Sequence, residues 1–349
     1  MKNRYIFGLL ILLFCLLFFL DIIMGSVQIP FGEALRIIFR PGTVKGGDEV
    51  EAWKSIILLF RLPRALTALS AGFGLSLGGL FMQTLFRNPL AGPSVLGITA
   101  GANLGVASVV LILGMSASGQ YLHSFPVGMK LMMVLAAIGG AALVLLLILL
   151  ISRFVGSVAV LLLFGLMCGY LANSLVTLLI HFASAGQIQA YIQWTFGSFG
   201  STTWADIRIF LPLAAACLLP ALLFIKPLNA FLLGEEYARS MGVHVMRVRI
   251  GLITVTSILA GLVTAYCGPV TFLGVAVPHI ARGIVRSSDH RQVLPATLLV
   301  GASAALCADL ISHMPGRPGV LPLNAITAIL GVPVVMWVLG RRKQRSGLV

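Results

Sequence analysis

Long uninterrupted apolar runs constrain the fold of this chain more than any other feature of its sequence. The stretch from Leu131 to Ile151, for example, contains no charged side chain. An α-helix needs about 20 consecutive apolar residues to cross the hydrocarbon core of a bilayer. A membrane-spanning β-strand would instead show segments of roughly ten residues in which apolar and polar side chains alternate. The runs therefore predict an all-α integral membrane protein.

The charge content supports this prediction. Only 10% of the residues are charged, whereas about 25% are charged in a typical soluble domain. The formal net charge of +14 comes from basic residues in short loops between apolar runs, as in membrane proteins whose cytoplasmic loops are rich in Lys and Arg. We therefore expect the lipid bilayer, and no nucleic acid, to contact this chain. No repeat or interdomain linker is visible, so residues 1–349 are predicted to form a single transmembrane domain.

Scanning for runs of the required length predicts about ten transmembrane helices. Fifteen of the 24 Lys and Arg residues fall on one side of this topology and nine on the other. The richer side is predicted to be cytoplasmic, which places both termini inside the cell. The predicted spans cover approximately residues 5–24, 65–85, 94–114, 131–151, 158–182, 207–225, 248–268, 270–286, 293–312 and 322–340.

Two segments depart from a simple span. The eighth, 270–286, is short and contains Pro278, so we expect a partial or broken span surrounded by protein. Between the first two spans, residues 31–39 form an amphipathic patch that we expect to lie on the outer membrane surface.

Sequence signatures of catalysis are missing. The chain contains no G-x-x-x-x-G-K-[ST] phosphate-binding loop and no H-E-x-x-H zinc motif. We therefore predict no catalytic residues, no metal site and no cofactor on this chain. Asp309 is the charged residue placed deep in a predicted span, and we interpret it as a hydrogen-bond acceptor between helices.

The segment Arg61-Leu62-Pro63-Arg64 places two arginines on the side that is poor in positive charge. Snorkelling toward lipid phosphates is one interpretation. Docking of an external partner with acidic groups is the other, because Arg pairs well with carboxylates. The physical argument alone leaves both open.

Several segments together resemble the permease subunits of ABC importers for iron–siderophore complexes, haem and cobalamin, the FecCD-type family. The resemblance runs in order over about residues 55–340. The matching segments are Arg61-Leu62-Pro63-Arg64, Gln83-x-x-x-x-Asn88-Pro89-Leu90-Ala91-x-Pro93-x-x-Leu96-Gly97, Gly234-Glu235-Glu236-x-Ala238-Arg239-x-Met241-Gly242, Phe272-x-Gly274-x-x-x-Pro278-His279-x-x-Arg282, Asp289-His290-Arg291 and Gly331-x-Pro333.

The resemblance implies an assembly. Members of the family form a homodimer in the bacterial inner membrane, with two ATP-binding subunits inside and a substrate-binding protein outside. ATP and Mg²⁺ would then be held by the partner ATPase. The function implied is translocation of an iron chelate, either an iron–siderophore or haem. Cobalamin is the alternative within the family, and an ion-gradient-driven secondary transporter is the alternative from another class.

The resemblance also implies residue roles. Arg61 and Arg64 would dock the binding protein; His313 stands where the family has a third docking arginine, and the nearby Arg317 is expected to substitute for it. The loop of about residues 226–247 would couple to the ATPase through Gly234, Glu235, Glu236, Ala238, Arg239 and Gly242. Gate residues would be Asn88, Pro89, Leu90, Gly156, Ser157 and Val158. His279 and Arg282 match the family without an assigned role, and packing or capping at the inner surface is expected for them.

Overall fold

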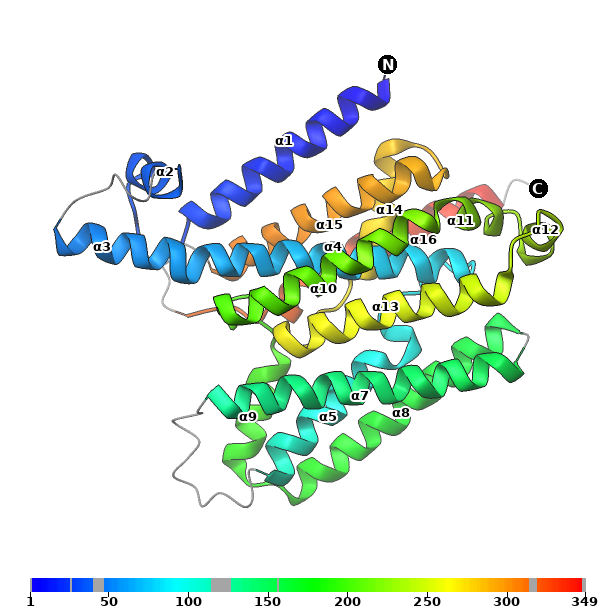
Figure 1. The fold of residues 1–349 in the computed structure, drawn as a ribbon, viewed down its shortest axis with the longest axis horizontal. Coiled ribbons are helices and arrows are strands. Elements are labelled where there is room, and N and C mark those ends of the chain that lie inside the picture. The colour runs from blue at the N-terminus through cyan, green and yellow to red at the C-terminus, as the bar shows by residue number, and fades with distance from the viewer. Residues whose placement is uncertain are drawn as a thin grey trace.

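The computed structural model describes residues 2–25, 27–39, 47–113, 127–155, 157–313 and 319–346. Every element in these ranges is a helix (Figure 1). In chain order the elements are α1 (Lys2–Ile23), α2 (Phe31–Phe39), α3 (Asp48–Ser55), the π-helical η1 (Ile56–Arg61), α4 (Leu62–Leu85), the 3₁₀-helical η2 (Pro93–Leu96), α5 (Ile98–Ala107), the π-helical η3 (Ser108–Leu113), α7 (Val127–Phe154), α8 (Val158–Phe182), α9 (Ala185–Thr195), α10 (Trp204–Leu223), α11 (Ile225–Phe231), α12 (Glu235–Ser240), α13 (Val245–Cys267), α14 (Leu273–Val285), α15 (His290–Ser312) and α16 (Leu323–Ser346).

Seven described helices are long and apolar enough to cross a membrane. Three shorter apolar helices, at 98–112, 273–285 and 323–337, coincide with the remaining predicted spans. The chain is thus an all-helical, multi-pass membrane protein, and the count of ten spans stays a prediction. The short length predicted for the eighth segment is confirmed. The 13 residues of α14 extend only about 20 Å, which is less than the thickness of the hydrocarbon core.

The second span differs from the prediction. It was expected over 65–85, but α3, η1 and α4 form one continuous helical stretch of 38 residues from Asp48 to Leu85. The π-helical turn allows α3 to continue directly into α4. The amphipathic patch at 31–39 does form a helix, α2, in which Ala34 and Ile37 are buried.

Helices α4, α13 and α15 form the centre of the bundle. Their most apolar windows are 83%, 78% and 61% buried, whereas those of α1 and α8 are only 17% buried. Glycines let both α15 and the neighbouring α14 approach α4 closely: a Cβ atom at Gly72 would lie 2.3 Å from the carbonyl oxygen of Gly301 in α15, and one at Gly79 would lie 1.7 Å from that of Gly274 in α14. Small residues let transmembrane helices pack backbone against backbone in this way.

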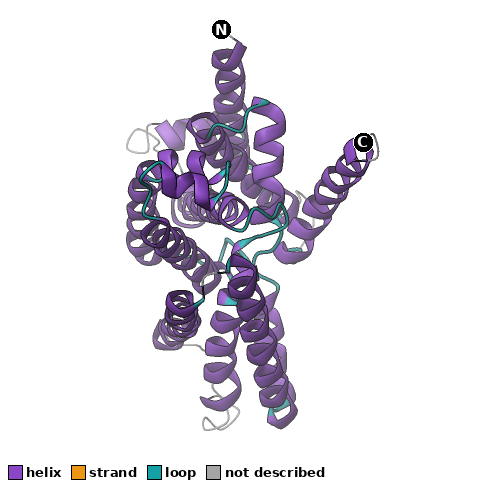
Figure 2. Ribbon diagram, turned by 90° about the vertical axis from the view of Figure 1, so that its right-hand side faces the viewer, coloured by secondary structure: helices purple, strands orange, loops and turns teal. Residues whose placement is uncertain are grey.

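A second group, α5, α7 and α8, packs below this centre in Figure 1 and forms a separate lobe in Figure 2. Glycines bring the backbones into close contact here as well. A Cβ atom at Gly101 would lie 2.5 Å from the carbonyl oxygen of Gly140, and one at Gly97 would lie 2.6 Å from that of Gly165. Gly97 also has φ +73°, which a glycine adopts without strain.

The helices run across Figure 1, and the two ends of the bundle differ. The end of α16 and the short helix α12 lie at the right-hand end, α2 and α3 lie at the left, and α1 is tilted with its start to the right of its end. The helix α16 therefore ends at the same end of the bundle as α12, and α1 begins on the side toward it. The cytoplasmic location of that end stays a prediction.

Candidate coupling and partner-binding surfaces

The loop that the resemblance assigns to ATPase coupling contains the short helix α12. Glu235 and Glu236 occupy the first turn of α12 and Arg239 the last, which suits the helix dipole at each end. The flanking glycines have φ +116° at Gly234 and φ +81° at Gly242. Backbone at positive φ strongly favours glycine, so these two residues fix where the short helix begins and ends.

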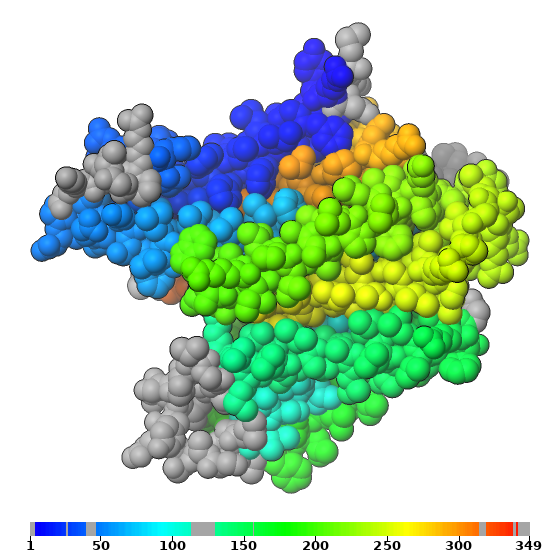
Figure 3. All heavy atoms as spheres, in the orientation of Figure 1, coloured from blue at the N-terminus to red at the C-terminus, as the bar shows by residue number. Residues whose placement is uncertain are grey.

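One face of α12 is presented to solvent. Glu236 and Arg239 are exposed, and Tyr237 and Met241 are 46% and 61% exposed. Ala238 is fully buried against the rest of the chain. The helix thus displays paired charges beside large apolar side chains, a mixture suited to a protein partner. In Figure 3 the yellow-green region that contains α12 protrudes at the right-hand end of the molecule.

Glu235 behaves differently from its neighbour. Its Oε1 and Oε2 atoms lie 2.9 and 3.1 Å from Nη2 of Arg249, a residue of α13 whose side chain is 4% exposed. Both carboxylate oxygens are therefore used within the chain, and the ion pair ties α12 to α13. The resemblance assigns Glu235 the same coupling role as Glu236 and Arg239, but its carboxylate faces α13.

The first predicted gate, Asn88-Pro89-Leu90, is a turn after α4. The backbone N–H of Leu90 donates to Oδ1 of Asn88 at 2.9 Å, an Asx-type turn. Nε2 of His279 lies 2.7 Å from the carbonyl oxygen of Pro89. The turn is thereby held to α14 by a residue that the sequence left without a role.

A second connection between α4 and α14 lies one turn away. Nη1 of Arg282 donates to Oε1 of Gln83 at 2.7 Å, and Nε2 of Gln83 donates to the carbonyl oxygen of Val275 at 3.0 Å. The amide of Gln83 thus bridges two points on α14. His279 thus packs the first gate segment, and Arg282 the end of α4, against the short span, which fits the packing role expected for them.

The second predicted gate lies between α7 and α8. Gly156 falls outside the described residues. Ser157 is exposed and precedes Val158, the first residue of α8. Nη1 of Arg249 donates to the carbonyl oxygen of the adjacent Val155 at 3.4 Å. The arginine that holds Glu235 therefore also contacts this loop.

At the opposite end of the bundle, Arg61 is directed into the chain. It is 4% exposed. Its guanidinium donates to the carbonyl oxygens of Ile22, Ile23 and Val27 at 3.2, 2.5 and 2.6 Å. Gly25 leaves room for it, because a Cβ atom there would lie 2.7 Å from Nη2 of Arg61. Arg61 thus ties the end of α1 to the start of α4.

Arg64 is buried as well, at 8% exposure. Its Nε lies 2.7 Å from Oδ2 of Asp309, and its Nη2 lies 3.8 Å from Oδ1 of Asp21. His313 approaches the same carboxylate, with Nδ1 3.3 Å from Oδ1 of Asp309. The interpretation of Asp309 as a polar link between helices fits this cluster. Asp21 was not singled out, although a carboxylate inside an apolar run signals it.

The burial of Arg61 and Arg64 does not fit their expected direct contact with an external protein. Both guanidinium groups are engaged by internal acceptors, and a docked partner would have to displace those acceptors first. Arg317, the third expected docking residue, lies outside the described residues.

A further polar network, which the sequence did not reveal, anchors α11 just before α12. Nδ2 of Asn229 donates to Oδ1 of Asp289 at 2.6 Å, and the backbone N–H of His290 donates to Oδ1 of Asn229 at 2.8 Å. Nε2 of His290 lies 3.0 Å from Oγ1 of Thr84 on α4. Asp289 also caps α15 by accepting from the N–H of Arg291. Hydrogen bonds from these neighbours lower the pKa of the Asp289 carboxyl below its usual value.

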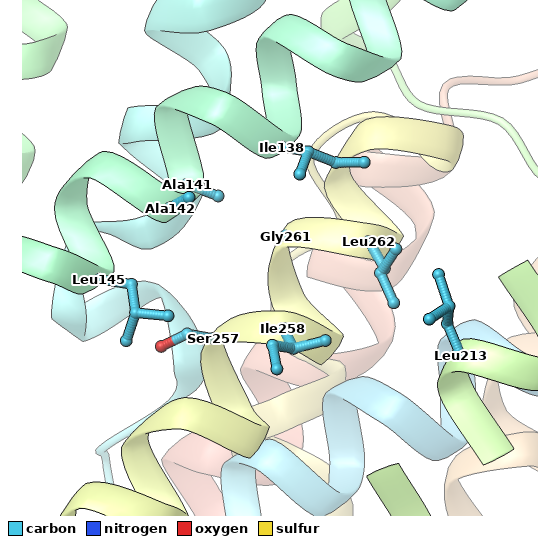
Figure 4. A pocket seen from close by; sticks show the side chains of 9 residues that line it. All are labelled: Ile138, Ala141, Ala142, Leu145, Leu213, Ser257, Ile258, Gly261 and Leu262. Carbon is cyan, nitrogen blue, oxygen red and sulfur yellow. The ribbon is translucent and has the colours of Figure 1, made fainter. Parts of the chain in front are cut away.

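An apolar groove between α7, α10 and α13 offers no comparable chemistry (Figure 4). Its volume is about 220 Å³. Ser257 is its polar side chain, and its hydroxyl already donates to the carbonyl oxygen of Ile253 at 2.7 Å. The groove therefore presents a surface suited to lipid tails rather than to a polar ligand. The other residues drawn there are Ile138, Ala141, Ala142, Leu145, Leu213, Ile258, Gly261 and Leu262.

Comparison with known proteins places these surfaces in context. The FecCD transport family matches residues 11–341. The vitamin B12 import system permease protein BtuC of Klebsiella pneumoniae is 35% identical over 349 residues, which cover 99% of this chain and 96% of that protein. The protein of the same name from Escherichia coli strain K12 is 36% identical over 283 residues, covering 80% of this chain and 82% of that protein.

Solved structures agree with the sequence relatives. A solved structure described as the inward-facing conformation of a metal-chelate type ABC transporter superposes on this chain with a TM-score of 0.79 at 26% identity. The match covers 97% of this chain and 99% of the other. PsaBC from Streptococcus pneumoniae has a TM-score of 0.51 at 15% identity, covers 82% of this chain and 94% of that one, and supports the fold alone.

Proposed function

This chain belongs to the FecCD transport family, and from that premise we propose that it is the transmembrane permease subunit of an ATP-driven importer of cobalamin. In this proposal it translocates the substrate across a bacterial inner membrane and catalyses no reaction itself. ATP hydrolysis, with its Mg²⁺, takes place on a separate subunit. The observation that carries the proposal is the exposed charged and apolar face of α12, in a chain whose sequence matches the family along nearly its whole length.

The substrate assignment rests on the relatives. The sequence alone favoured an iron chelate, with cobalamin as the alternative. Relatives at 35% and 36% identity are named as vitamin B12 import permeases, and this favours the alternative. An iron chelate is the second candidate, because the similar solved structure is described as a metal-chelate type transporter.

A second copy of this chain is proposed to complete the pathway. Helix α8 is largely uncovered within one chain, and its exposed face carries Tyr170, Asn173, Ser174 and Thr177. These residues recur at three- and four-residue spacing and therefore share one face of the helix. Polar groups in a span normally face protein or water rather than lipid. A homodimer with α8 along a hydrated pathway would satisfy them.

The remaining partners are proposed to bind at the two ends of the bundle. Two ATP-binding subunits would contact the α12 faces. A substrate-binding protein would dock at the end that carries α2 and α3. The buried Arg61 and Arg64 would there act by holding α1, α4 and α15 in the shape that the binding protein recognises.

Transport assays test the proposal. A bacterium that lacks its own cobalamin permease would express this chain with the ATPase and binding protein encoded beside it. We expect uptake of radiolabelled cyanocobalamin, and its loss when the phosphate-binding lysine of the ATPase is replaced. Uptake of a ferric siderophore in place of cyanocobalamin would favour the second candidate. Uptake by this chain alone, driven by an ion gradient, would instead show a secondary transporter and reject the proposal.

A further inference from the structure

Arg249 contacts two segments that are far apart in the sequence. Its Nη2 lies 2.9 and 3.1 Å from the carboxylate oxygens of Glu235 on α12, and its Nη1 lies 3.4 Å from the carbonyl oxygen of Val155. Fourteen and 94 positions separate these partners from Arg249. One guanidinium group therefore joins the coupling helix to the loop before α8.

The group is well suited to transmit a displacement. A guanidinium is planar and rigid, so two partners bound to different nitrogens keep a fixed relation to each other. Its burial, at 4% exposure of the side chain, keeps water from replacing either partner. If α12 moves relative to α13, Glu235 moves the guanidinium with it, or a buried charge loses its partner. The first outcome carries the motion to Val155.

The start of α12 also adjoins the other gate segment. A Cβ atom built on Gly234 would lie 3.7 Å from Nη1 of Arg87, so the two residues are neighbours. Arg87 immediately precedes Asn88 and has φ +47°, a conformation that costs a non-glycine residue energy. The residues that directly precede the two predicted gate segments are thus near the start of α12: Arg87 adjoins Gly234, and Val155 shares Arg249 with Glu235.

We infer that Arg249 is a positioning residue that couples displacement of α12 to Val155, the residue that follows α7. In this inference Arg249 acts through Glu235 and Val155 rather than on the substrate itself. The inference rests on the proposed function, because it needs a partner that displaces α12.

Thiol labelling of the loop measures this coupling without a transport substrate. Ser157, which is exposed, is replaced by Cys in the complete complex with ATPase and binding protein, and the unsubstituted chain sets the labelling background. A membrane-impermeant maleimide is applied with and without a non-hydrolysable ATP analogue. Two variants are compared on this background: Arg249→Met, and the matched control Arg247→Met at an exposed position of the same helix.

We expect the nucleotide-dependent change in labelling rate to fall about tenfold in Arg249→Met, the scale of a coupling residue, and to persist in Arg247→Met. Glu235→Gln should lower it as well. The double variant with Arg249→Met should be no worse than the worse single variant, because the two residues act as one unit. A purely structural role would lower the thermal midpoint of Arg249→Met without this non-additive pattern in labelling.

The outcomes distinguish a failure of the inference about Arg249 from a failure of the proposed function. An undiminished nucleotide response in Arg249→Met would overturn the inference and leave the proposed function intact. If that variant does not assemble, Glu235→Gln decides in the same way, since it preserves side-chain size. No nucleotide response in the Ser157→Cys parent, together with no ATP-driven uptake by the unsubstituted chain, would reject the proposed function and the inference with it.

Discussion

The Nε atom of Arg64 lies 2.7 Å from the Oδ2 atom of Asp309, and both side chains are buried where α4 and α15 meet. The pair joins two central helices near the end of the bundle that carries α2 and α3. Asp21 of α1 lies beside it, 3.8 Å from Nη2 of Arg64. Three helices therefore depend on one small group of charges for their relative positions.

Removal of one partner should destabilise the chain strongly. Asp309→Leu leaves the Arg64 guanidinium buried without its closest carboxylate, which costs about 3–5 kcal/mol when a buried pair is broken. The double variant with Arg64→Met replaces both charges with apolar groups and should recover much of the loss. Thermal unfolding in detergent measures both. An Asp309→Leu variant with the unfolding midpoint of the parent chain would contradict the prediction.

Backbone packing between α5 and α7 permits a comparison of two adjacent glycines. A Cβ atom at Gly140 would lie 2.0 Å from the carbonyl oxygen of Gly101, whereas one at Gly139 would meet nothing within 4 Å. Gly140→Ala should force the helices apart and cost about 1–3 kcal/mol. Gly139→Ala is the matched control and should be neutral or slightly stabilising. Equal unfolding midpoints for the two variants would argue against the close helix contact.

The spans could be predicted from sequence because length and hydrophobicity follow directly from bilayer thickness. The short helix α12 could be predicted as well, since its carboxylates, Arg239 and Gly242 are local signals. The roles of Arg249 and Asn229 could not. Each acts through partners brought close by the fold, and a charge count assigns Arg249 only to a side of the membrane.

The arginines of the segment Arg61-Leu62-Pro63-Arg64 also depend on partners that only the fold supplies. Their position before a span predicted an exposed location, but the segment belongs to one continuous helical stretch from Asp48 to Leu85. Arg61 and Arg64 consequently face α1 and α15. Whether a side chain turns toward the core or the solvent depends on which neighbouring helix offers acceptors, and local sequence does not specify that neighbour.

The contribution of Asp289 to folding stability should depend on pH. Hydrogen bonds in the folded chain lower the pKa of its carboxyl, so the folded state favours the ionised form. The resulting stability is present above the unfolded pKa, about 3.9, and is lost as the pH falls through the lower folded pKa. Asp289→Asn retains a good helix cap and should remove this part of the pH dependence. Unfolding midpoints of the parent chain and of Asp289→Asn, measured at several pH values, check this prediction. The same dependence of the midpoint on pH in the two chains would contradict it.

The exposed face of α12 should decide binding of the ATPase. Glu236 and Arg239 are exposed, whereas Glu235 is engaged by Arg249. Charge reversal by Glu236→Arg with Arg239→Glu should change the free energy of unfolding of the isolated chain by no more than about 0.5 kcal/mol, because surface substitutions rarely cost more. Retention of the ATPase on the immobilised permease should fall at low salt, since close like charges replace complementary ones. Asp48→Arg, at the opposite end of the bundle and also exposed, is the control for a charge reversal away from α12. Unchanged retention of the ATPase by the α12 variant, with Asp48→Arg equally unaffected, would show that the ATPase binds elsewhere.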